Sequence, residues 1–508
     1  MGVLDPNRRK GLTMPEGTTR IAALDIVREA GLLKDKAYID GAWVGADDGG
    51  DFPVLDPATG REIGRVPNMG AAETRRAIDA AAAAWPAWRA RTAKDRAAVL
   101  RRWYGLIMDN QEALAVLMTA EQGKPLGEAR GEIAYGASFV EWFAEEGKRL
   151  YGEVVPAHGT DKRILTLREP IGVVAAITPW NFPSAMITRK VAPALAAGCP
   201  VVLKPAEDTP LSALALVELA ERAGLPKGLI NVVTTHEAKA VGGEMTANPI
   251  VRKLSFTGST EVGKILMAQC AGTVKKVSLE LGGNAPFIVF DDADLEAAVA
   301  GAIASKYRNA GQTCVCANRL YVQEGIYEAF TEKLKAKVEA MRVGPALEGD
   351  VQQGPLINKK GLDKVDGLVR DALDKGATAV LGGKVHALGG TFYEPTILTG
   401  VTAAMRMATE EIFGPVAPLY RFSTEAEAIA LANATRFGLA AYFYTRDIGR
   451  VWRVAEGLEY GIVGINEGII STESAPFGGV KESGIGREGS RHGIDDFVEI
   501  KYLCMGGI

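Results

Sequence analysis

The segment Leu254-Ser255-Phe256-Thr257-Gly258-Ser259-Thr260-Glu261-Val262-Gly263-Lys264 passes from a short β-rich run through a glycine turn into a helical pattern. On both sides of it, further β-rich runs alternate with helical stretches. Such alternation indicates βαβ units and a parallel, doubly wound sheet. Strands are predicted at 171–177, 200–204, 229–233, 253–256 and 274–279, and helices at 211–223 and 260–270.

The rest of the chain adds a second α/β series and an N-terminal region of a different kind. At 508 residues the chain exceeds what one core supports, so two or three domains are expected. The first 35 residues resemble a variable arm that ends in a short helix, residues 37–67 predict hairpin strands, and 71–150 predict long helices. The second series runs from 285 to about 470, with strands at 285–290, 377–381 and 461–465 and a helix at 425–434. The fold class is therefore α/β, with two domains meeting near Glu280.

Composition excludes several classes of protein. The 58 Lys and Arg residues nearly balance the 62 Asp and Glu, and no basic stripe supports nucleic-acid binding. Five cysteines in so long a chain do not form a disulfide framework and fit a reducing compartment. The longest apolar run, 191–203, is too short and too rich in Pro and Gly to span a membrane, and the N-terminus does not resemble a signal peptide. A cytoplasmic enzyme without membrane association is expected.

Two glycine patterns resemble phosphate-binding loops. Gly258 to Lys264 matches the nucleotide-triphosphate loop, but Ile265 stands where Ser or Thr would bind magnesium. The segment follows a strand and opens a helix, so its N–H groups and helix dipole can still hold a pyrophosphate. Gly484-Ile485-Gly486-Arg487-Glu488-Gly489 fits the dinucleotide fingerprint, but too few residues follow it for a βαβ unit. We interpret this second match as a turn.

A thiol and a carboxylate in two Gly-containing segments suggest the chemistry. Cys314 lies in Asn309-Ala310-Gly311-Gln312-Thr313-Cys314-Val315-Cys316, and Glu280 opens Glu280-Leu281-Gly282-Gly283-Asn284. A thiolate can add to a carbonyl, and a carboxylate can activate the water that releases the adduct. Most cysteines are small buried hydrophobes, and Cys199, Cys270 and Cys504 keep that interpretation. The four histidines are scattered singly, so neither a metal site nor a Cys–His pair is supported.

Six motifs in order make the chain resemble the aldehyde dehydrogenase superfamily from about residue 37 to the end. They are Thr178-Pro179-Trp180-Asn181-Phe182-Pro183, Lys204-Pro205-Ala206-Glu207, Phe256-Thr257-Gly258-Ser259-Thr260, Glu280-Leu281-Gly282-Gly283, Gly311-Gln312-Thr313-Cys314 and Glu411-Ile412-Phe413-Gly414-Pro415. Within the superfamily the chain most resembles succinate-semialdehyde dehydrogenases, in the stretches 185–190, 306–309, 314–318 and 466–471.

The resemblance implies two Rossmann-type domains and a small β element for oligomerisation. It places an arm at 1–36, an NAD-binding domain at 37–150 and 166–281, and a catalytic domain at 282–480. The resemblance also implies oligomerisation strands at 151–165 and 490–508. By itself the alternating segment 497–504 would be an exposed edge. A homo-oligomer is expected, with dimer and tetramer both open.

The resemblance also implies a mechanism that needs no metal. The Cys314 thiolate attacks the aldehyde carbon, while the Asn181 amide and the Cys314 backbone N–H hold the oxyanion. Hydride transfer leaves a thioester on Cys314, and water activated by Glu280 hydrolyses it. An ordinary thiol is only a few per cent ionised at neutral pH, so proton transfer to Glu280 or other local help is needed.

The dinucleotide-binding residues carry over from the same motifs. Lys204 and Glu207 are expected at the adenosine ribose, Gly258 and Ser259 at the pyrophosphate, and Glu411 at the nicotinamide ribose, with Trp180, Leu281 and Phe413 nearby. A carboxylate at 207 accepts hydrogen bonds from the ribose of NAD but repels a 2′-phosphate. NAD is therefore the expected cofactor, and NADP stays possible because Lys204 offsets part of the repulsion.

Two arginines indicate the substrate. Arg189 and Arg308, with the Ser471 hydroxyl, suit an aldehyde that carries a carboxylate at its far end, although both arginines could instead form structural salt bridges. Succinate semialdehyde is the expected substrate. Glutarate semialdehyde is the alternative, because one methylene changes binding by only about 1–3 kcal/mol.

Three further possibilities stay open. Cys316 could form a reversible, strained disulfide with Cys314, or it could be structural. A cofactor-free thiol hydrolase or acyltransferase would use the same Cys314 and Glu280. A non-catalytic binding protein is conceivable but would not need these two residues together with Asn181.

Overall fold

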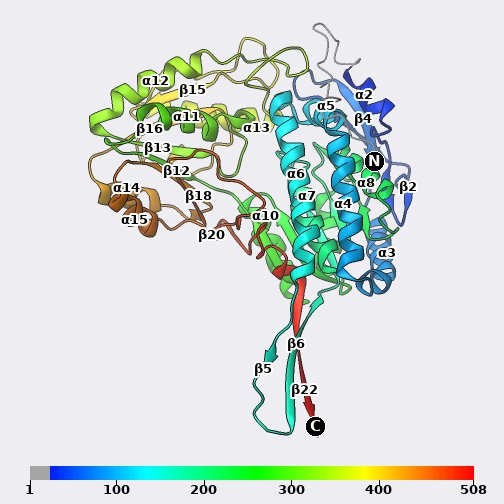
Figure 1. Cartoon of the computed structure of the whole chain (residues 1–508). Coiled ribbons are helices and arrows are strands. Elements are labelled where there is room, and N and C mark those ends of the chain that lie inside the picture. The colour runs from blue at the N-terminus through cyan, green and yellow to red at the C-terminus, as the bar shows by residue number, and fades with distance from the viewer. Residues whose placement is uncertain (1–22) are drawn as a thin grey trace, which may run out of the picture.

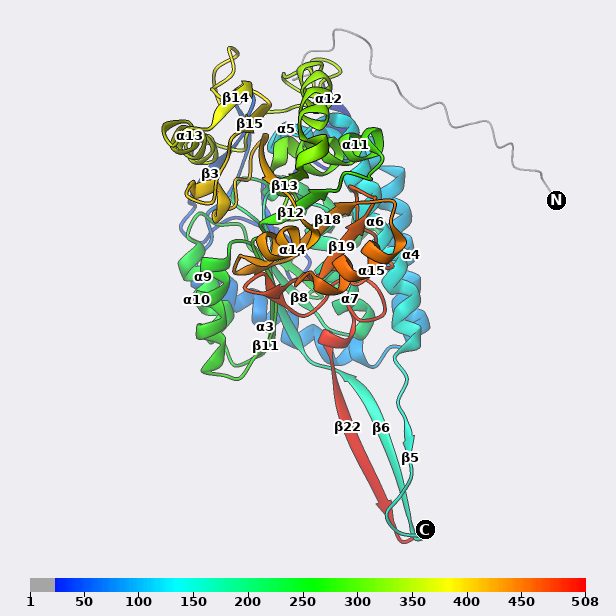
Figure 2. The same cartoon turned by 90° about the vertical axis from the view of Figure 1, so that its left-hand side faces the viewer.

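The computed structural model describes residues 23–508, which form two sheet-centred halves and a long ribbon that projects from them (Figures 1 and 2). Most of the predicted N-terminal arm, residues 1–22, lies outside the described residues. The short helix predicted at the end of the arm is α2, Asp25–Glu29.

The first half contains an eight-stranded sheet in the order β2-β1-β9-β8-β7-β10-β11-β21. Its five central strands, β9 to β11 in this order, are parallel, and the edge strands are antiparallel. All five strands predicted between 171 and 279 are confirmed, with ends that shift by a few residues. The strands are β1 Ala37–Ile39, β2 Ala42–Val44, β7 Val173–Ile177, β8 Val201–Lys204, β9 Ile230–Val232, β10 Val251–Thr257, β11 Lys276–Glu280 and β21 Gly484–Ile485.

Helices cover this sheet, and those predicted within 71–150, 211–223 and 260–270 are confirmed. Local sequence sets their ends: α8 begins with Pro210 in its first turn, and α7 ends at Gly198, whose φ is 105°. The helices of this half are α3 Ala71–Arg89, α4 Ala93–Asp109, α5 Gln111–Gln122, α6 Leu126–Glu146, α7 Ala185–Ala197, α8 Pro210–Arg222, α9 Ala238–Ala247 and α10 Thr260–Ala271.

The second half contains a seven-stranded sheet in the order β14-β15-β16-β13-β12-β18-β19, parallel except for β14. The α/β class with two doubly wound sheets is confirmed. Its strands are β12 Ala285–Val289, β13 Ala317–Gln323, β14 Thr378–Leu381, β15 Thr396–Thr399, β16 Val416–Phe422, β18 Ala440–Tyr444 and β19 Ile462–Ile465. Its helices are α11 Leu295–Lys306, α12 Tyr327–Glu339, α13 Lys359–Asp374, α14 Glu425–Asn433 and α15 Ile448–Gly457.

The projecting ribbon joins segments that are far apart in the sequence (Figure 2). β22, Val498–Gly506, pairs antiparallel with β6, Lys162–Pro170, which also pairs with β5, Val154–Val155. The predicted C-terminal strand is confirmed. β6 extends past the predicted limit at residue 165, because its pairing with β22 continues to Pro170 opposite Val498.

Shorter elements complete the described chain. The hairpin of β3, Asp51–Leu55, and β4, Glu62–Pro67, confirms the strands predicted within 37–67. The Gly484–Gly489 pattern forms a two-residue strand and turns with no α-helix after it, as interpreted from the sequence. The remaining elements are β17 Phe437–Gly438, β20 Val480–Lys481 and the 3-10 turns η1 Gly147–Arg149, η2 Arg308–Gly311, η3 Glu324–Ile326, η4 Arg406–Ala408 and η5 Asp495–Phe497.

Strand order positions a crevice at the edge of the first sheet. The order reverses between β7 and β10, and ligands of such sheets bind at the carboxyl ends of the strands beside that reversal. β11 ends there at Glu280, and the chain then enters β12 at Ala285, which pairs with Ala317 just after Cys314. The carboxyl edge of the first sheet therefore faces the amino edge of the second.

Candidate active site

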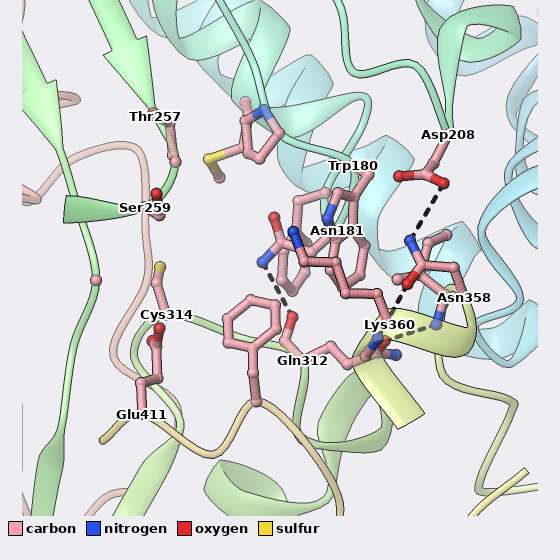
Figure 3. A pocket seen from close by; sticks show the side chains of 18 of the residues that line it. Trp180, Asn181, Asp208, Thr257, Ser259, Gln312, Cys314, Asn358, Lys360 and Glu411 are labelled. Atoms are coloured by element: carbon pink, nitrogen blue, oxygen red, sulfur yellow. Dashed lines mark hydrogen bonds between the residues drawn. The ribbon is translucent and has the colours of Figure 1, made fainter. Parts of the chain in front are cut away.

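A pocket of about 550 Å³ lies where the two sheets meet (Figure 3). In Figure 3 Thr257, Ser259, Cys314 and Glu411 lie along one side of it, and Asp208 and Asn358 lie at the other. Nine of the residues predicted for the site line the pocket: Trp180, Asn181, Glu207, Gly258, Ser259, Leu281, Cys314, Glu411 and Phe413.

A strained turn leads the chain to Cys314. Asn309, Ala310 and Gly311 all have positive φ, of 52°, 53° and 74°, which costs free energy at the two residues that are not glycine. At Gly311 an added Cβ would lie 2.1 Å from the Gly414 carbonyl oxygen, so only glycine fits. The Asn309 side chain holds the turn, because its amide nitrogen donates to the Asn181 carbonyl at 3.0 Å.

Burial dominates the electrostatics of the thiol and the carboxylate. It raises the pKa of Cys314 to about 12, with a further increase from the negative charge of Glu411. Burial and the neighbouring Glu488 raise the pKa of Glu280 well above its ordinary range. One oxygen of Glu280 is buried without a hydrogen-bond partner. The negative charge of Glu280 also raises the pKa of Cys314, because a thiolate near a carboxylate is disfavoured.

Buried polar groups fix Asn181. Its side-chain nitrogen donates to the Gln312 carbonyl at 3.0 Å, and its own carbonyl accepts from Lys124 Nζ at 2.7 Å. Lys124 forms a buried ion pair with Glu132, which also accepts the N–H group of Ser184 at 2.9 Å, just before α7. The backbone carbonyl of Asn181 is therefore fixed by Lys124, and its side-chain amide points to the turn that leads to Cys314.

One wall of the pocket is aromatic and carries a carboxylate. The rings of Trp180 and Phe413 meet edge to face at 5.5 Å, and Phe413 has a φ of 58°. Glu411 lies beside this wall and accepts the Gly283 N–H at 3.1 Å. Burial raises the pKa of Glu411 to about 7.

The other part of the pocket fits a dinucleotide. Ser259 caps the twelve-residue helix α10, and its N-terminus opens into the pocket beside the Thr257 hydroxyl, which is buried without a partner. Lys204 Nζ lies 3.3 Å from Glu207 Oε2, so this carboxylate keeps a partly compensated negative charge. A helix N-terminus with an unpaired hydroxyl suits a pyrophosphate, and a carboxylate suits ribose hydroxyls.

A cluster of charged side chains affects the pKa of the Cys314 thiol but does not line the pocket. Arg189 is buried, and its Nε lies 2.8 Å from Glu488 Oε2. The Nε of Arg189 therefore forms a structural salt bridge, which was the alternative to substrate binding. Its Nη2 and the Nε of Arg308 are buried without hydrogen-bond partners. Burial raises the pKa of the Tyr135 hydroxyl, while the positive charges of Arg189 and Arg308 and a hydrogen bond with Ser471 lower it, so these side chains lie close together. The structure thus brings the three predicted substrate residues together.

Cys316 is buried and unbridged. Its sulfur donates to the Lys306 carbonyl at 3.4 Å, and burial raises the pKa of its thiol. The disulfide hypothesis for Cys314 and Cys316 stays a prediction.

Sequence reasoning did not find several residues at the site. Asp208 and the α13 side chains of Lys360 and Lys364 line the pocket, and Tyr135 and Glu488 join the charged cluster. Of these residues, only Glu488 lies in a segment that the sequence analysis singled out, the Gly484–Gly489 pattern. Within residues 23–508, no helix is long and apolar enough to cross a membrane, and no group of three metal-ligating side chains occurs.

Comparisons with known proteins agree with this geometry. The model of the aldehyde dehydrogenase family matches residues 43–503. A glutarate-semialdehyde dehydrogenase of Pseudomonas aeruginosa is 66% identical, over 95% of this chain and 100% of the relative. A succinate-semialdehyde dehydrogenase [NADP(+)] of Escherichia coli is 63% identical, over 94% and 99%. The crystal structure of succinate-semialdehyde dehydrogenase from Burkholderia pseudomallei is 65% identical with a TM-score of 0.93, covering 94% of this chain and 98% of that one.

Proposed function

The chain belongs to the aldehyde dehydrogenase family, and we propose that it oxidises succinate semialdehyde to succinate with NAD as the preferred acceptor. Glutarate semialdehyde is the second candidate, because a relative of that name is 66% identical. Both substrates carry an aldehyde at one end and a carboxylate at the other.

The observation that carries the substrate proposal is the set of buried, unpartnered donors around Arg308. An unpaired buried guanidinium N–H costs free energy, and a carboxylate would satisfy it. Arg189 Nη2 and Arg308 Nε are both in this state, and Ser471 lies with them. An uncharged aldehyde would leave these donors unpaired, which disfavours its binding relative to a carboxylated one.

Cys314 would carry the acyl group. Because the pKa of its thiol is raised to about 12, we infer that attack on the aldehyde carbon accompanies transfer of the thiol proton to Glu280. The Asn181 amide has a second N–H besides the one that binds Gln312, and this N–H would stabilise the oxyanion of the thiohemiacetal. NAD bound in the pocket would supply the acceptor for the hydride of the thiohemiacetal carbon, so the acyl group would remain on Cys314 as a thioester.

Glu280 would then act as the base for hydrolysis. Its raised pKa makes the carboxylate a stronger base, and its unpartnered oxygen is available to a water molecule. Glu280 would first release the thiol proton to solvent. A proton would then pass from this water to Glu280, the hydroxide would add to the thioester carbon, and the carbon–sulfur bond would break to give succinic acid and the Cys314 thiolate.

The dinucleotide would bind along the pocket from Glu411 to Glu207. Ser259 and the N-terminus of α10 would hold the pyrophosphate, and Glu207 would accept hydrogen bonds from the adenosine ribose. Asp208, next to Glu207 in the pocket, adds a second carboxylate that disfavours a 2′-phosphate. The ion pair between Lys204 and Glu207 weakens that repulsion, so NADP would be used less well than NAD.

We also propose a homo-oligomer assembled through the ribbon. β22 has an unpaired edge, and its Ile500 and Tyr502 side chains are 68% and 58% exposed. An exposed apolar edge of this length is protected in folded proteins by pairing or by burial against another chain.

The test is initial-rate NADH formation with succinate semialdehyde, glutarate semialdehyde and butanal, each with NAD and with NADP. The proposal expects kcat/KM for both semialdehydes to exceed that for butanal by about 100-fold or more, as for the loss of a charge-assisted pair. The ratio of the two semialdehydes identifies the substrate. Equal kcat/KM for butanal would contradict the proposed substrate class.

A further inference from the structure

Asn181, whose amide is assigned above to the oxyanion, is tied to two further buried side-chain amides, those of Gln122 and Asn309. Gln122 Nε2 donates to Asn309 Oδ1 at 3.0 Å. Asn309 Nδ2 donates in turn to the main-chain carbonyl of Asn181 at 3.0 Å. All three side chains are buried, so water does not compete for these hydrogen bonds.

The Gln312 carbonyl closes this network around Asn181. It accepts one N–H group from the Asn181 side chain at 3.0 Å (Figure 3) and another from Asn309 Nδ2 at 3.2 Å. The Asn309 amide therefore holds the main chain of Asn181 and also the acceptor of the Asn181 side chain. Because Gln312 lies two residues before Cys314, this one amide sets how the Asn181 side chain is placed relative to the thiol.

Gln122 decides which end of the Asn309 amide carries the nitrogen. The two ends of a side-chain amide have nearly the same shape, so their hydrogen-bond partners select the orientation. The backbone N–H of Lys124 donates to Gln122 Oε1 at 3.0 Å, and this N–H cannot act as an acceptor. Gln122 must therefore present its nitrogen to Asn309. A reversed Asn309 amide would place its oxygen against the two carbonyls that it now binds.

The network begins in the connection between α5 and α6. Gln122 is the last residue of α5, and Lys124 lies two residues before α6 begins at Leu126. Lys124 Nζ is a second donor to the Asn181 carbonyl, at 2.7 Å, and Glu128 of α6 accepts the Asn309 backbone N–H at 2.7 Å. This connection thus holds the Asn181 segment and the strained turn before the thiol at the same time.

We propose that Gln122 and Asn309 are positioning residues, which hold the second N–H of the Asn181 amide toward the oxygen of the aldehyde adduct on Cys314. An oxyanion hole is effective when its donors are in place before the charge develops, because no reorganisation is then needed during the reaction. The inference rests on the proposed function, in which Asn181 stabilises the thiohemiacetal. It concerns the aldehyde end of the substrate rather than the carboxylate end.

Gln122→Met tests this role, because methionine keeps the length of the side chain and removes its amide. We expect kcat/KM to fall about tenfold or more, but by less than the factor of about 100 to 1000 that follows removal of an oxyanion donor. The loss should be equal for succinate semialdehyde and butanal, because both aldehydes form the same oxyanion. An unchanged kcat/KM in Gln122→Met would overturn the proposal.

Gln111→Met is the matched control on the same helix. It also removes a side-chain amide that donates to a backbone carbonyl, that of Arg130 at 2.9 Å, but this amide has no bond to the network around Asn181. Its kcat/KM should stay within about twofold of the unaltered protein, because no oxyanion donor is displaced. A loss as large as that in Gln122→Met would assign the effect of Gln122 to helix packing and would overturn the proposal.

A double-mutant cycle separates positioning from a general loss of structure. If Gln122 acts through Asn181, Gln122→Met should cost less than about twofold more in kcat/KM when it is added to Asn181→Ala. Losses that multiply would show that Gln122 acts independently of Asn181, and they would refute the positioning role.

Asn309→Gly is a second variant, which keeps the test available if Gln122→Met does not fold. The φ of Asn309 is 52°, which glycine adopts without strain, so the substitution removes the amide and relieves the backbone. It should show a similar loss of kcat/KM and the same lack of further loss in Asn181→Ala. Full activity of Asn309→Gly would contradict the proposal.

Alkylation of Cys314 by iodoacetamide gives a measurement that does not depend on turnover. The sulfur–carbon bond forms as iodide leaves, and no oxyanion develops, so the rate in Gln122→Met should stay within about twofold of the unaltered protein. A fall as large as that in kcat/KM would mean that Gln122 positions the thiol instead of the Asn181 amide, and the proposal would be wrong.

Asn181→Ala alone separates this inference from the proposed function. If Asn181→Ala loses activity while Gln122→Met and Asn309→Gly keep it, only the positioning role is wrong. If Asn181→Ala keeps full activity on both aldehydes, Asn181 does not stabilise the oxyanion, and that step of the proposed function fails together with the inference.

Discussion

Arg189 Nε lies 2.8 Å from Glu488 Oε2, and both side chains are buried beside the candidate active site. Glu488 also pairs with Lys190, the next residue of α7. One carboxylate therefore compensates two buried cations, and its negative charge raises the pKa of Glu280. Glu488 links the proposed substrate site to the proposed base.

Glu488→Gln should move the pH dependence of the reaction. Glu280 acts in its deprotonated form, so kcat/KM rises with pH through its pKa, which burial and Glu488 hold high. Without the charge of Glu488, Glu280 deprotonates more easily, and the acidic limb of the pH profile shifts to lower pH. A pH–rate profile from pH 5 to 9 measures this, and an unmoved or upward-shifted limb would contradict the coupling.

The same substitution should cost stability. Breaking a buried ion pair leaves Arg189 and Lys190 uncompensated, with a typical cost of about 3–5 kcal/mol. Denaturant unfolding compares the variant with Glu425→Gln, a partly exposed carboxylate with two arginine partners. An equal, small loss in both variants would show that burial adds nothing at Glu488.

Arg308→Ala should raise the KM for succinate semialdehyde about 10- to 100-fold and change the KM for butanal little. The Nε of Arg308 is buried without a partner and would bind the carboxylate that butanal lacks. Steady-state kinetics on both aldehydes measures the two KM values. The control is Arg421→Ala, at an exposed arginine that pairs with Glu328 and does not line the pocket. Equal losses on the two aldehydes would assign Arg308 a structural role.

Glu207→Gln should move cofactor preference toward NADP. The substitution keeps the shape and removes the negative charge, and it frees Lys204 Nζ, now 3.3 Å from Glu207, to meet a 2′-phosphate. The ratio of kcat/KM with NAD to that with NADP should fall by about tenfold or more, which corresponds to about 1.4 kcal/mol. A constant ratio would remove Glu207 from cofactor selection.

Cys316 gives a prediction about oxidation. If a disulfide with Cys314 forms, peroxide inactivates the protein and thiol reductant restores it, whereas Cys316→Ala is inactivated without recovery. Both thiols are free and have raised pKa values in this structure, so the reaction should be slow at neutral pH. Equal recovery of Cys316→Ala and the unaltered protein would exclude the switch.

Local sequence patterns predicted most of the fold, because apolar runs, glycine turns and helix caps act on residues that are close in the sequence. The strand, glycine turn and helix from β10 to α10 follow from an apolar run, Gly258 and the Ser259 cap, all within one short segment. The extent of β6 was underestimated, since its last residues are strand only because β22, more than 300 positions away, pairs with them.

Only some residues of the site were predicted, because the others come together through contacts between segments that are far apart in the sequence. Cys314, Glu280 and Asn181 lie in distinctive motifs, but Tyr135 sits in an ordinary amphipathic helix and joins the charged cluster only where α6 passes Arg189 and Arg308. The left-handed turn at Asn309 and Ala310 was also unpredictable, because neither residue demands positive φ and tertiary hydrogen bonds impose it.

The most direct test of the division of labour between Cys314 and Glu280 is mass spectrometry of Glu280→Gln after brief mixing with succinate semialdehyde and NAD. In this variant the thiol proton must pass to solvent, which slows acylation, whereas hydrolysis loses the base that activates water. The thioester should therefore still accumulate, and a peptide containing Cys314 should carry one succinyl group that hydroxylamine removes. The control Cys314→Ala should carry none. Absence of any adduct on Cys314, with turnover continuing in Glu280→Gln, would contradict the mechanism.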